Sequence, residues 1–117
     1  YLHVIQHDKM IRYVNQDGDE NINNAAIIAE AQASTMSFTL EGADKGLFAL
    51  VNPLTAERKQ TLSVKTEQGI AQVELQYLGN FNDAISKTVN IVVTAGARTT
   101  TLTTTIEDRL NILTHIV

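Results

Sequence analysis

The sequence predicts an all-β fold, an antiparallel sandwich of about seven strands. Several segments alternate apolar and polar residues with a period of two, which is typical of strands that bury one face. Turn-forming residues recur about every 8–12 residues, the spacing of short strands in sandwiches and barrels. Because one face of each strand stays in water, an antiparallel sheet is favoured over a parallel sheet buried on both sides.

Length and composition limit the class of protein. The chain has 117 residues, of which 44% are hydrophobic and 19% charged, so residues 1–117 are expected to form a single globular domain. No apolar run approaches the ~20 residues that span a bilayer, so we expect no membrane insertion. The net charge of −4 disfavours nucleic acid as a partner, and the absence of cysteine excludes disulfides and thiolate metal sites.

The central part of the chain predicts a meander of three strands. Residues 60–66 and 70–78 both alternate, and Glu67-Gln68-Gly69 between them has the length and the glycine of a hairpin loop. Turn residues follow at 79–83, and the β-branched run 85–94 is the third predicted strand. The prediction therefore places all three strands in one sheet.

Further strands are predicted on both sides of this meander. Residues 36–40 and 47–51 are short runs that end at turn residues. Residues 99–106 are rich in threonine, whose stiff side chain favours extended backbone. An alternative reading of this threonine run is a regular hydroxyl face that binds ice, glycans or another subunit. Strand propensity is favoured, because one strand does not supply the repetition that such a face needs.

Two segments are ambiguous between helix and strand. Residues 23–33 combine alanines with a possible cap at Asn24, which favours a short helix, but the sandwich context favours a strand over Ala25–Ala31. Residues 107–117 fit a helix or a final strand equally well. A short helix is therefore expected at one of these two places, if the fold contains one.

Both ends of the sequence are apolar, at residues 1–6 and 111–117. Such segments are usually terminal strands of the domain's own sheet. The alternative is that one of them pairs with a neighbouring subunit by β-augmentation. Because the chain starts at Tyr1 without a leader, we expect a processed product or an excised domain.

One stretch resembles a known type of module. Residues 36–50 contain an alternating strand, then Gly42-Ala43-Asp44, then a small residue and Leu47-Phe48. This phrase, with the later strands to about residue 95, is similar to bacterial cadherin-like and Ig-like repeats. The resemblance implies a β-sandwich surface module. It places these residues in the core: Phe38, Phe48, Val73, Leu75 and Tyr77. Residues 54–59 lack the acidic phrase of cadherin calcium sites, so calcium binding between domains is not implied.

One acidic cluster has the composition of a metal site. Asn15, Asp17, Asp19 and Asn21 alternate, and calcium takes oxygen ligands of these kinds. No EF-hand register fits, because the glycine and the final glutamate of that loop fall on the wrong residues. The favoured reading is a solvated turn with Gly18 at its tip, and a weak calcium site is the alternative.

The remaining candidates for chemistry are isolated residues. His3, His7 and His115 are expected to be ordinary surface or edge residues. No Gly-x-Ser-x-Gly elbow or phosphate-binding glycine loop is present, and the acidic pair Glu41 and Asp44 is better explained by turn chemistry. No enzyme is predicted, and no cofactor is expected other than the calcium of the alternative above.

The functional hypothesis is a non-enzymatic extracellular or cell-surface module with a structural or adhesive role. It would be a filament subunit or a domain of an adhesin, its partners copies of itself or other surface proteins, joined by β-strand addition. The alternative is a small accessory module of a larger secreted protein, which binds carbohydrate or calcium. Both rest on fold class and resemblance.

Overall fold

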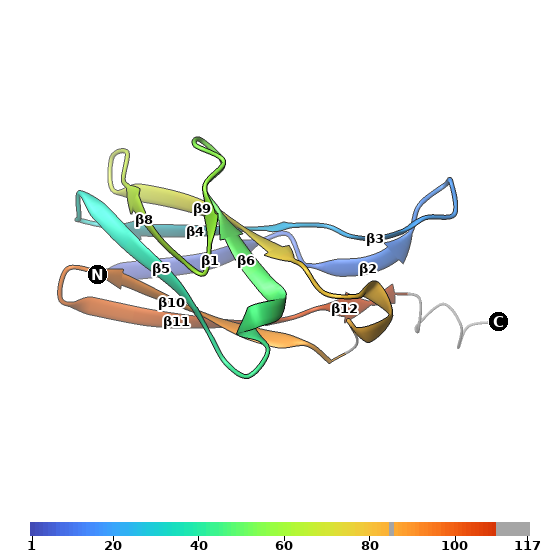
Figure 1. Ribbon diagram of the computed structural model, residues 1–117. Coiled ribbons are helices and arrows are strands. Elements are labelled where there is room, and N and C mark those ends of the chain that lie inside the picture. Colours follow the sequence, from blue (N-terminus) through green and yellow to red (C-terminus); the bar gives the residue numbers. More distant parts are fainter. Residues whose placement is uncertain (85, 110–117) are drawn as a thin grey trace.

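The computed structural model describes residues 1–84 and 86–109, and this part of the chain is built from strands joined by short connections (Figure 1). The strands are β1 (Leu2–His7), β2 (Ile11–Val14), β3 (Glu20–Ile22), β4 (Ala25–Ala31), β5 (Thr35–Glu41), β6 (Phe48–Val51), β7 (Arg58–Lys59), β8 (Thr61–Lys65), β9 (Ile70–Tyr77), β10 (Thr88–Ala95), β11 (Arg98–Thr105) and β12 (Glu107–Asp108). Two 3-10 helices, η1 (Lys45–Leu47) and η2 (Phe81–Asp83), lie in the connections.

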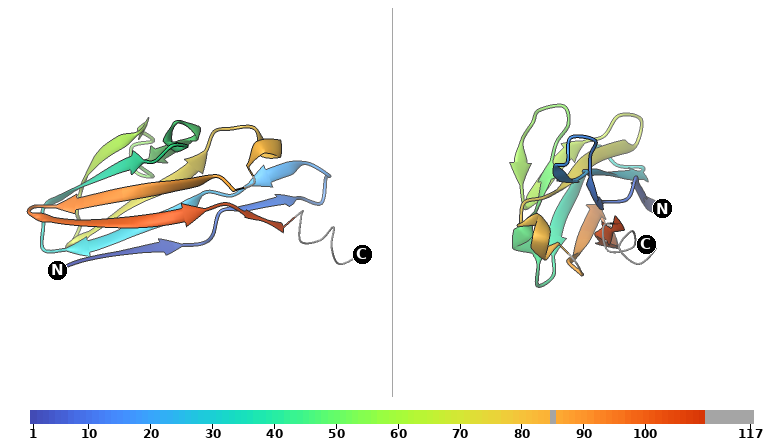
Figure 2. Two further views of the ribbon diagram at one scale, coloured as in Figure 1. Left: turned by 90° about the horizontal axis from the view of Figure 1, so that it is seen from below. Right: turned by 90° about the vertical axis from the view of Figure 1, so that its right-hand side faces the viewer.

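The strands form a two-layer sandwich with a small third sheet at one end. A five-stranded sheet has the order β1-β4-β9-β6-β7, and a four-stranded sheet has the order β11-β10-β5-β8. The third sheet, β12-β2-β3, extends the body along its long axis, which gives overall dimensions of 50 × 24 × 23 Å (Figure 2). The predicted all-β sandwich is therefore confirmed.

The core lies between the two large sheets and follows the predicted alternation. Every second residue of β9 is buried, as is every second residue of β5 and β10. The five aromatic and aliphatic residues expected in the core are all buried there, and the Phe48 and Tyr77 rings meet edge to face at 5.3 Å between centroids. Burial of these single-sided strands against each other is the main source of stability.

The predicted hairpin between residues 60–66 and 70–78 is wrong. β8 pairs with β5 in the four-stranded sheet, whereas β9 pairs with β4 and β6 in the five-stranded sheet. Glu67 and Ile70 form one isolated bridge, so the turn is tight, but the chain crosses there from one layer to the other. The meander is also wrong, because β10 pairs with β5 and β11. One-sided alternation is equally satisfied by strands that face each other across a core.

The ambiguous segment Ala25–Ala31 forms strand β4, so a helix over residues 23–33 is wrong. Every second residue from Ala25 to Ala31 is buried, the residues between them are half-buried or exposed, and β4 pairs with both β1 and β9 in the interior of the sheet. Tertiary burial therefore overrides the helical propensity of alanine. Residues 110–117 lie outside the described residues, so the choice between helix and strand there stays a prediction.

A break separates the main sheet from the end sheet. β1 and β4 pair in one stretch and β2 and β3 in another, and Asp8, with φ of 68°, begins the irregular segment between them. Asn23 bridges the break: its Oδ1 accepts from the Ile11 amide at 2.8 Å, and its Nδ2 donates to the Lys9 carbonyl at 2.6 Å. Side-chain bonds thus replace ladder bonds at this kink.

The N-terminal apolar segment lies within the domain's own sheet. β1 pairs along its whole length with β4, and Leu2 and Val4 pack against the core. The C-terminal apolar segment, residues 111–117, lies outside the described residues. The described chain leads toward it through β12, which pairs in parallel with β2 at the far end of the body. Whether either segment also contacts a neighbouring subunit stays a prediction.

Candidate functional site

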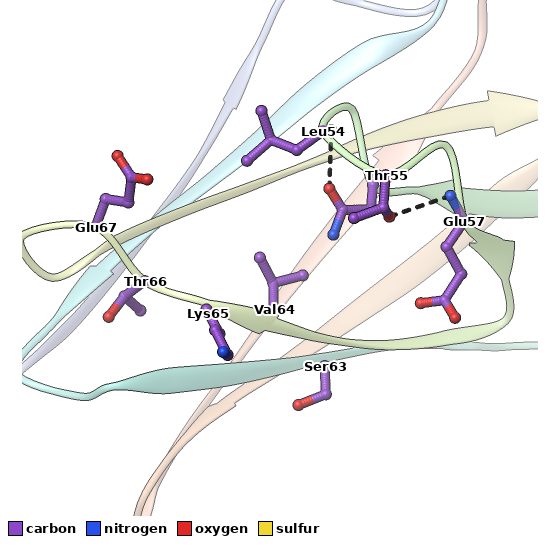
Figure 3. Close-up of a pocket in the computed structure, with 9 residues that line it drawn as sticks. Leu54, Thr55, Glu57, Ser63, Val64, Lys65, Thr66 and Glu67 are labelled. Carbon is purple, nitrogen blue, oxygen red and sulfur yellow. Dashed lines mark hydrogen bonds between the residues drawn. The ribbon is translucent and has the colours of Figure 1, made fainter.

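The candidate site is a groove between the β6–β7 loop and strand β8. Asn52, Leu54, Thr55 and Glu57 line it from the loop, and residues 63–67 line it from β8 and the turn that follows (Figure 3). The groove has a volume of about 810 Å³. An extended peptide of several residues would fit in a groove of this size, which makes the groove the candidate binding site.

The β8 side of the groove is an open sheet edge. β8 is the last strand of the four-stranded sheet, and its partner is β5. The amide of Leu40 donates to the Gln60 carbonyl at 2.9 Å, and the amide of Thr66 donates to the Ser34 carbonyl at 2.9 Å. Since hydrogen-bonded pairs alternate along an antiparallel ladder, the even-numbered residues of β8 bond to β5.

The same alternation leaves the odd-numbered residues with their backbone directed at the groove. Thr61, Ser63 and Lys65 therefore present three amides and three carbonyls at the open edge. Their side chains are exposed, whereas Leu62 and Val64 are buried in the core. This is the arrangement that accepts a further strand, with main-chain hydrogen bonds on one side and core packing on the other.

The opposite wall of the groove is a loop with a defined shape. The Asn52 amide donates to the Glu57 carbonyl and the Ala56 amide donates to the Asn52 carbonyl, both at 2.8 Å. The Asn52 side chain accepts from the Leu54 amide at 2.9 Å. Ala56 has a left-handed backbone with φ of 63°, which reverses the chain. These bonds hold Leu54 at the groove with 84% of its surface exposed.

An apolar surface continues from the groove onto the five-stranded sheet. Pro53, Leu54 and Ile70 line a second depression beside the first, and Ile70 in turn borders a third with Ile5 and Ile28. Ile5 and Ile70 are each 45% exposed. Exposed aliphatic side chains that gather in one place are a mark of interaction surfaces.

Charges lie at the rim of the groove. Lys65 and Glu67 line it from the turn side, and Glu57 lines it from the loop. Glu57 also pairs with Lys59 at 3.0 Å, and both side chains are largely exposed. Lys65 lies on the edge strand β8, and an edge lysine discourages indiscriminate pairing of the open strand. A partner must therefore supply a suitable sequence.

The predicted metal residues lie in the β2–β3 hairpin. The Asn15 Oδ1 atom accepts from the amides of Asp17 and Asp19, both at 3.0 Å, and Gly18 has φ of 85° at the tip. Asn21 lies on β3, where its side-chain Nδ2 atom donates to the Tyr13 hydroxyl at 2.9 Å. Asn15 and Asn21 therefore each make hydrogen bonds within the hairpin itself. Within residues 1–84 and 86–109, no three side chains of His, Asp or Glu form a group that could hold a metal ion.

The remaining candidate residues are dispersed. His3 and His7 lie on the exposed outer face of β1, and His115 lies outside the described residues. Glu41 ends β5, and Asp44 precedes η1, where the Leu47 amide donates to its carbonyl. Among the described residues, no helix has the length and the apolar character needed to cross a membrane.

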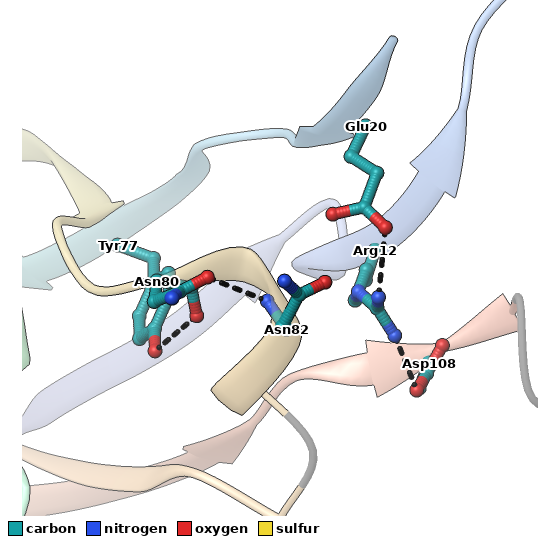
Figure 4. Close-up of polar contacts among 6 residues, drawn as sticks. All are labelled: Arg12, Glu20, Tyr77, Asn80, Asn82 and Asp108. Carbon is teal, nitrogen blue, oxygen red and sulfur yellow. Dashed lines mark hydrogen bonds and ion pairs between the residues drawn. The ribbon is translucent and has the colours of Figure 1, made fainter. Parts of the chain in front are cut away.

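Two polar clusters near the end sheet have structural roles (Figure 4). Arg12 joins β2, β3 and β12 through ion pairs to Glu20 and Asp108, each at 3.0 Å. Tyr77 donates its hydroxyl to the Asn80 carbonyl at 3.1 Å. Burial raises the pKa of Tyr77, and the nearby carboxylates of Asp83 and Asp44 raise it further.

Comparisons with protein-family models, with curated proteins and with solved structures gave no match. The groove was not among the sites predicted from the sequence. The signals that point to it are the Asn52-Pro53 turn, which shapes the loop, and the alternation of Thr61, Ser63 and Lys65, which marks a strand exposed on one face. Only the sheet order shows that β8 is an edge strand.

Proposed function

We propose that this chain is a non-enzymatic extracellular structural module whose copies join by β-strand addition. The single observation that carries the proposal is the open edge of β8, which faces a groove whose opposite wall presents Leu54. Main-chain bonds to Thr61, Ser63 and Lys65 would provide affinity, and Leu54 would provide a contact for alternate apolar side chains.

The proposed occupant is the segment 111–117 of a second copy. This segment is apolar enough to fill the groove and contains no Asp, Glu, Lys or Arg. Its sequence is Asn111-Ile112-Leu113-Thr114-His115-Ile116-Val117. The described chain ends at Arg109 beside β12, at the opposite end of the long axis from β8 (Figure 1). A contact between opposite ends is head-to-tail, and such contacts build open chains of subunits unless they close into a ring.

The extracellular setting of the proposal is supported by the β-sandwich fold, which many surface modules use, and the lack of cysteine is compatible with it. A surface filament and an adhesin array both require subunits that join noncovalently, without a catalysed reaction. The elongated body, with its proposed donor and acceptor elements at opposite ends, suits either assembly.

The test is the molar mass in solution over a range of concentrations, by light scattering or sedimentation. We expect assembly that is lost when residues 111–117 are deleted and inhibited by a free peptide of that sequence. Ser63→Pro removes an amide at the open edge without removing a bond to β5, so it should block assembly while the domain stays folded. Ser63→Ala keeps the amide and serves as the matched control. A monomer at every concentration, or assembly that Ser63→Pro leaves intact, would refute the proposal.

A second pair of variants tests the loop wall. Leu54→Asp places a charge in the groove at a side chain that is 84% exposed, so it should weaken assembly without lowering the melting temperature. Leu78→Asp is the control, since Leu78 is also exposed, at 47%, but does not line the groove. Equal effects of the two variants would show that the groove is not the contact.

A further inference from the structure

The outer face of the four-stranded sheet is an array of hydroxyl groups. The register aligns its outward side chains in rows across all four strands. One row contains Thr99, Thr94, Ser37 and Ser63, and the next contains Thr101, Val92, Thr39 and Thr61. A third row contains Thr103, Asn90 and Glu41, and a fourth contains Thr105 and Thr88. In the first two rows, every position except Val92 carries a hydroxyl group.

Strand propensity alone does not explain this arrangement. Threonine is favoured on the solvent side of any strand, so propensity would place it on both outer faces. The outer face of the five-stranded sheet has His, Ile, Ala, Val, Gln, Glu and Arg at its outward positions on β1, β4, β6, β7 and β9, and no serine or threonine. The hydroxyl groups are thus segregated on one side of the sandwich, although β5, β8 and the β10–β11 hairpin come from separate parts of the sequence.

Several of these side chains are held in place by their neighbours. The hydroxyl groups of Thr88 and Thr105 lie 2.9 Å apart, and those of Thr94 and Thr99 lie 3.3 Å apart. Thr103 donates to the Asn90 Oδ1 atom at 2.6 Å. Because β-branched side chains also have few rotamers, the array presents ordered hydroxyl and methyl groups with little entropy left to lose on binding.

The charge and composition of the face restrict its partner. The charged residues Glu41 and Lys65 flank the two complete rows, one on each side. The complete rows themselves carry no charged side chain, so they offer no counter-charge to an acidic or basic polymer. They carry no aromatic ring, so a sugar would find no stacking surface. The partner that remains is one that is itself neutral, periodic and rich in hydrogen-bonding oxygen.

The spacing of the rows suits an ordered water lattice. Outward residues repeat about every 6.6–6.8 Å along a strand and about every 4.8 Å between strands, the general dimensions of a β-sheet. The surface oxygens of ice repeat at similar intervals in two directions. Figure 2 shows β10 and β11 side by side along the length of the body, so the array follows the long axis. We propose that this hydroxyl face binds ice.

The test is inhibition of ice recrystallisation by the purified chain, together with thermal hysteresis. We expect ice crystals to stay small in its presence, and we expect Thr101→Lys and Thr39→Lys to lose this effect, because each places a long charged side chain within the second row. Gln72→Lys is the matched control. It is exposed on the outer face of β9, on the opposite side of the sandwich, and should keep full activity.

Circular dichroism and the melting temperature should be unchanged in all three variants, since Thr101 and Gln72 are exposed and the half-buried Thr39 lies on the outer side of β5, away from the core. The wild-type chain failing to affect ice growth would overturn the proposal, as would equal losses in Thr101→Lys and Gln72→Lys. Binding of the chain to insoluble cellulose or chitin through Thr101 and Thr39, without an effect on ice, would assign the face to a polysaccharide instead. The result does not depend on assembly through β8, because Thr101 lies on the far strand of the sheet.

Discussion

Arg12 and Asp108 lie opposite each other in the parallel pair of β2 and β12, with the guanidinium Nη1 atom 3.0 Å from the carboxylate Oδ2 atom. Both side chains are nearly buried, with 10% and 8% of their surface exposed. The Nη2 atom of Arg12 pairs with Glu20 on the other side, also at 3.0 Å. One guanidinium group therefore holds all three strands of the end sheet together.

Removal of this guanidinium group should destabilise the domain strongly. Arg12→Leu leaves the Asp108 carboxylate in a buried position without this partner, and the expected loss is about 3 kcal/mol of unfolding free energy. Urea denaturation measures the effect. Arg58→Leu, at an exposed position of β7, is the control and should change stability little. Equal losses in the two variants would contradict the structural role of Arg12.

Gly69 is required where the chain crosses between the sheets. It has φ of +80°, and a Cβ atom there would lie 2.7 Å from the carbonyl oxygen of Ala31. Gly69→Ala should therefore cost about 1–3 kcal/mol, through backbone strain and the displacement of that carbonyl. Gly46→Ala is the matched control, because no atom lies within 4 Å of a Cβ atom at that position. Thermal melting of both variants tests the prediction.

Tyr77 should make stability depend on pH in the alkaline range. Burial, with the carboxylates of Asp83 and Asp44, raises the folded-state pKa of Tyr77, so the unfolded chain loses this proton first. The contribution of Tyr77 is therefore full below the ordinary tyrosine pKa of about 10 and is lost as pH rises through the raised value.

Comparison with Tyr77→Phe isolates this effect. At neutral pH the variant should be less stable by about 1 kcal/mol, since it lacks the bond to the Asn80 carbonyl. The difference should shrink as pH rises above about 10. A difference that stays constant or grows over that range would contradict the assignment.

The hairpin of Asn15, Asp17, Asp19 and Asn21 gives a prediction about calcium. Asn15 Oδ1 already accepts two backbone amides, and Asn21 bonds to Tyr13, so we expect calcium to leave the melting temperature unchanged. Melting curves with calcium and with a chelator test this. An upward shift with calcium that Asp17→Asn abolishes would favour the calcium site that the sequence offers as the alternative.

The local form of the chain followed from the sequence wherever one face of a strand had to be buried. Alternation identified the strands that contain Phe38, Val73 and Leu75, and all three side chains are buried as expected. The turn residues Asn52-Pro53 and Gly96 also lie between strands. These features depend on neighbours in the sequence and on a period of two, so they are visible without the fold.

Strand partners were decided only by the tertiary structure. The chain around Gly69 reads as a hairpin loop, yet β8 and β9 lie in opposite layers, because a buried face is satisfied equally by a neighbour in the same sheet or by a strand across the core. The same ambiguity hid the groove and the extent of the hydroxyl face beyond the threonine run. The edge at Ser63 exists because β8 ends a sheet, and the hydroxyl face exists because Thr101 aligns with residues far away in the sequence. A period of two specifies which side chains face water, but only pairing and layer order, which arise from long-range packing, specify what those side chains stand beside.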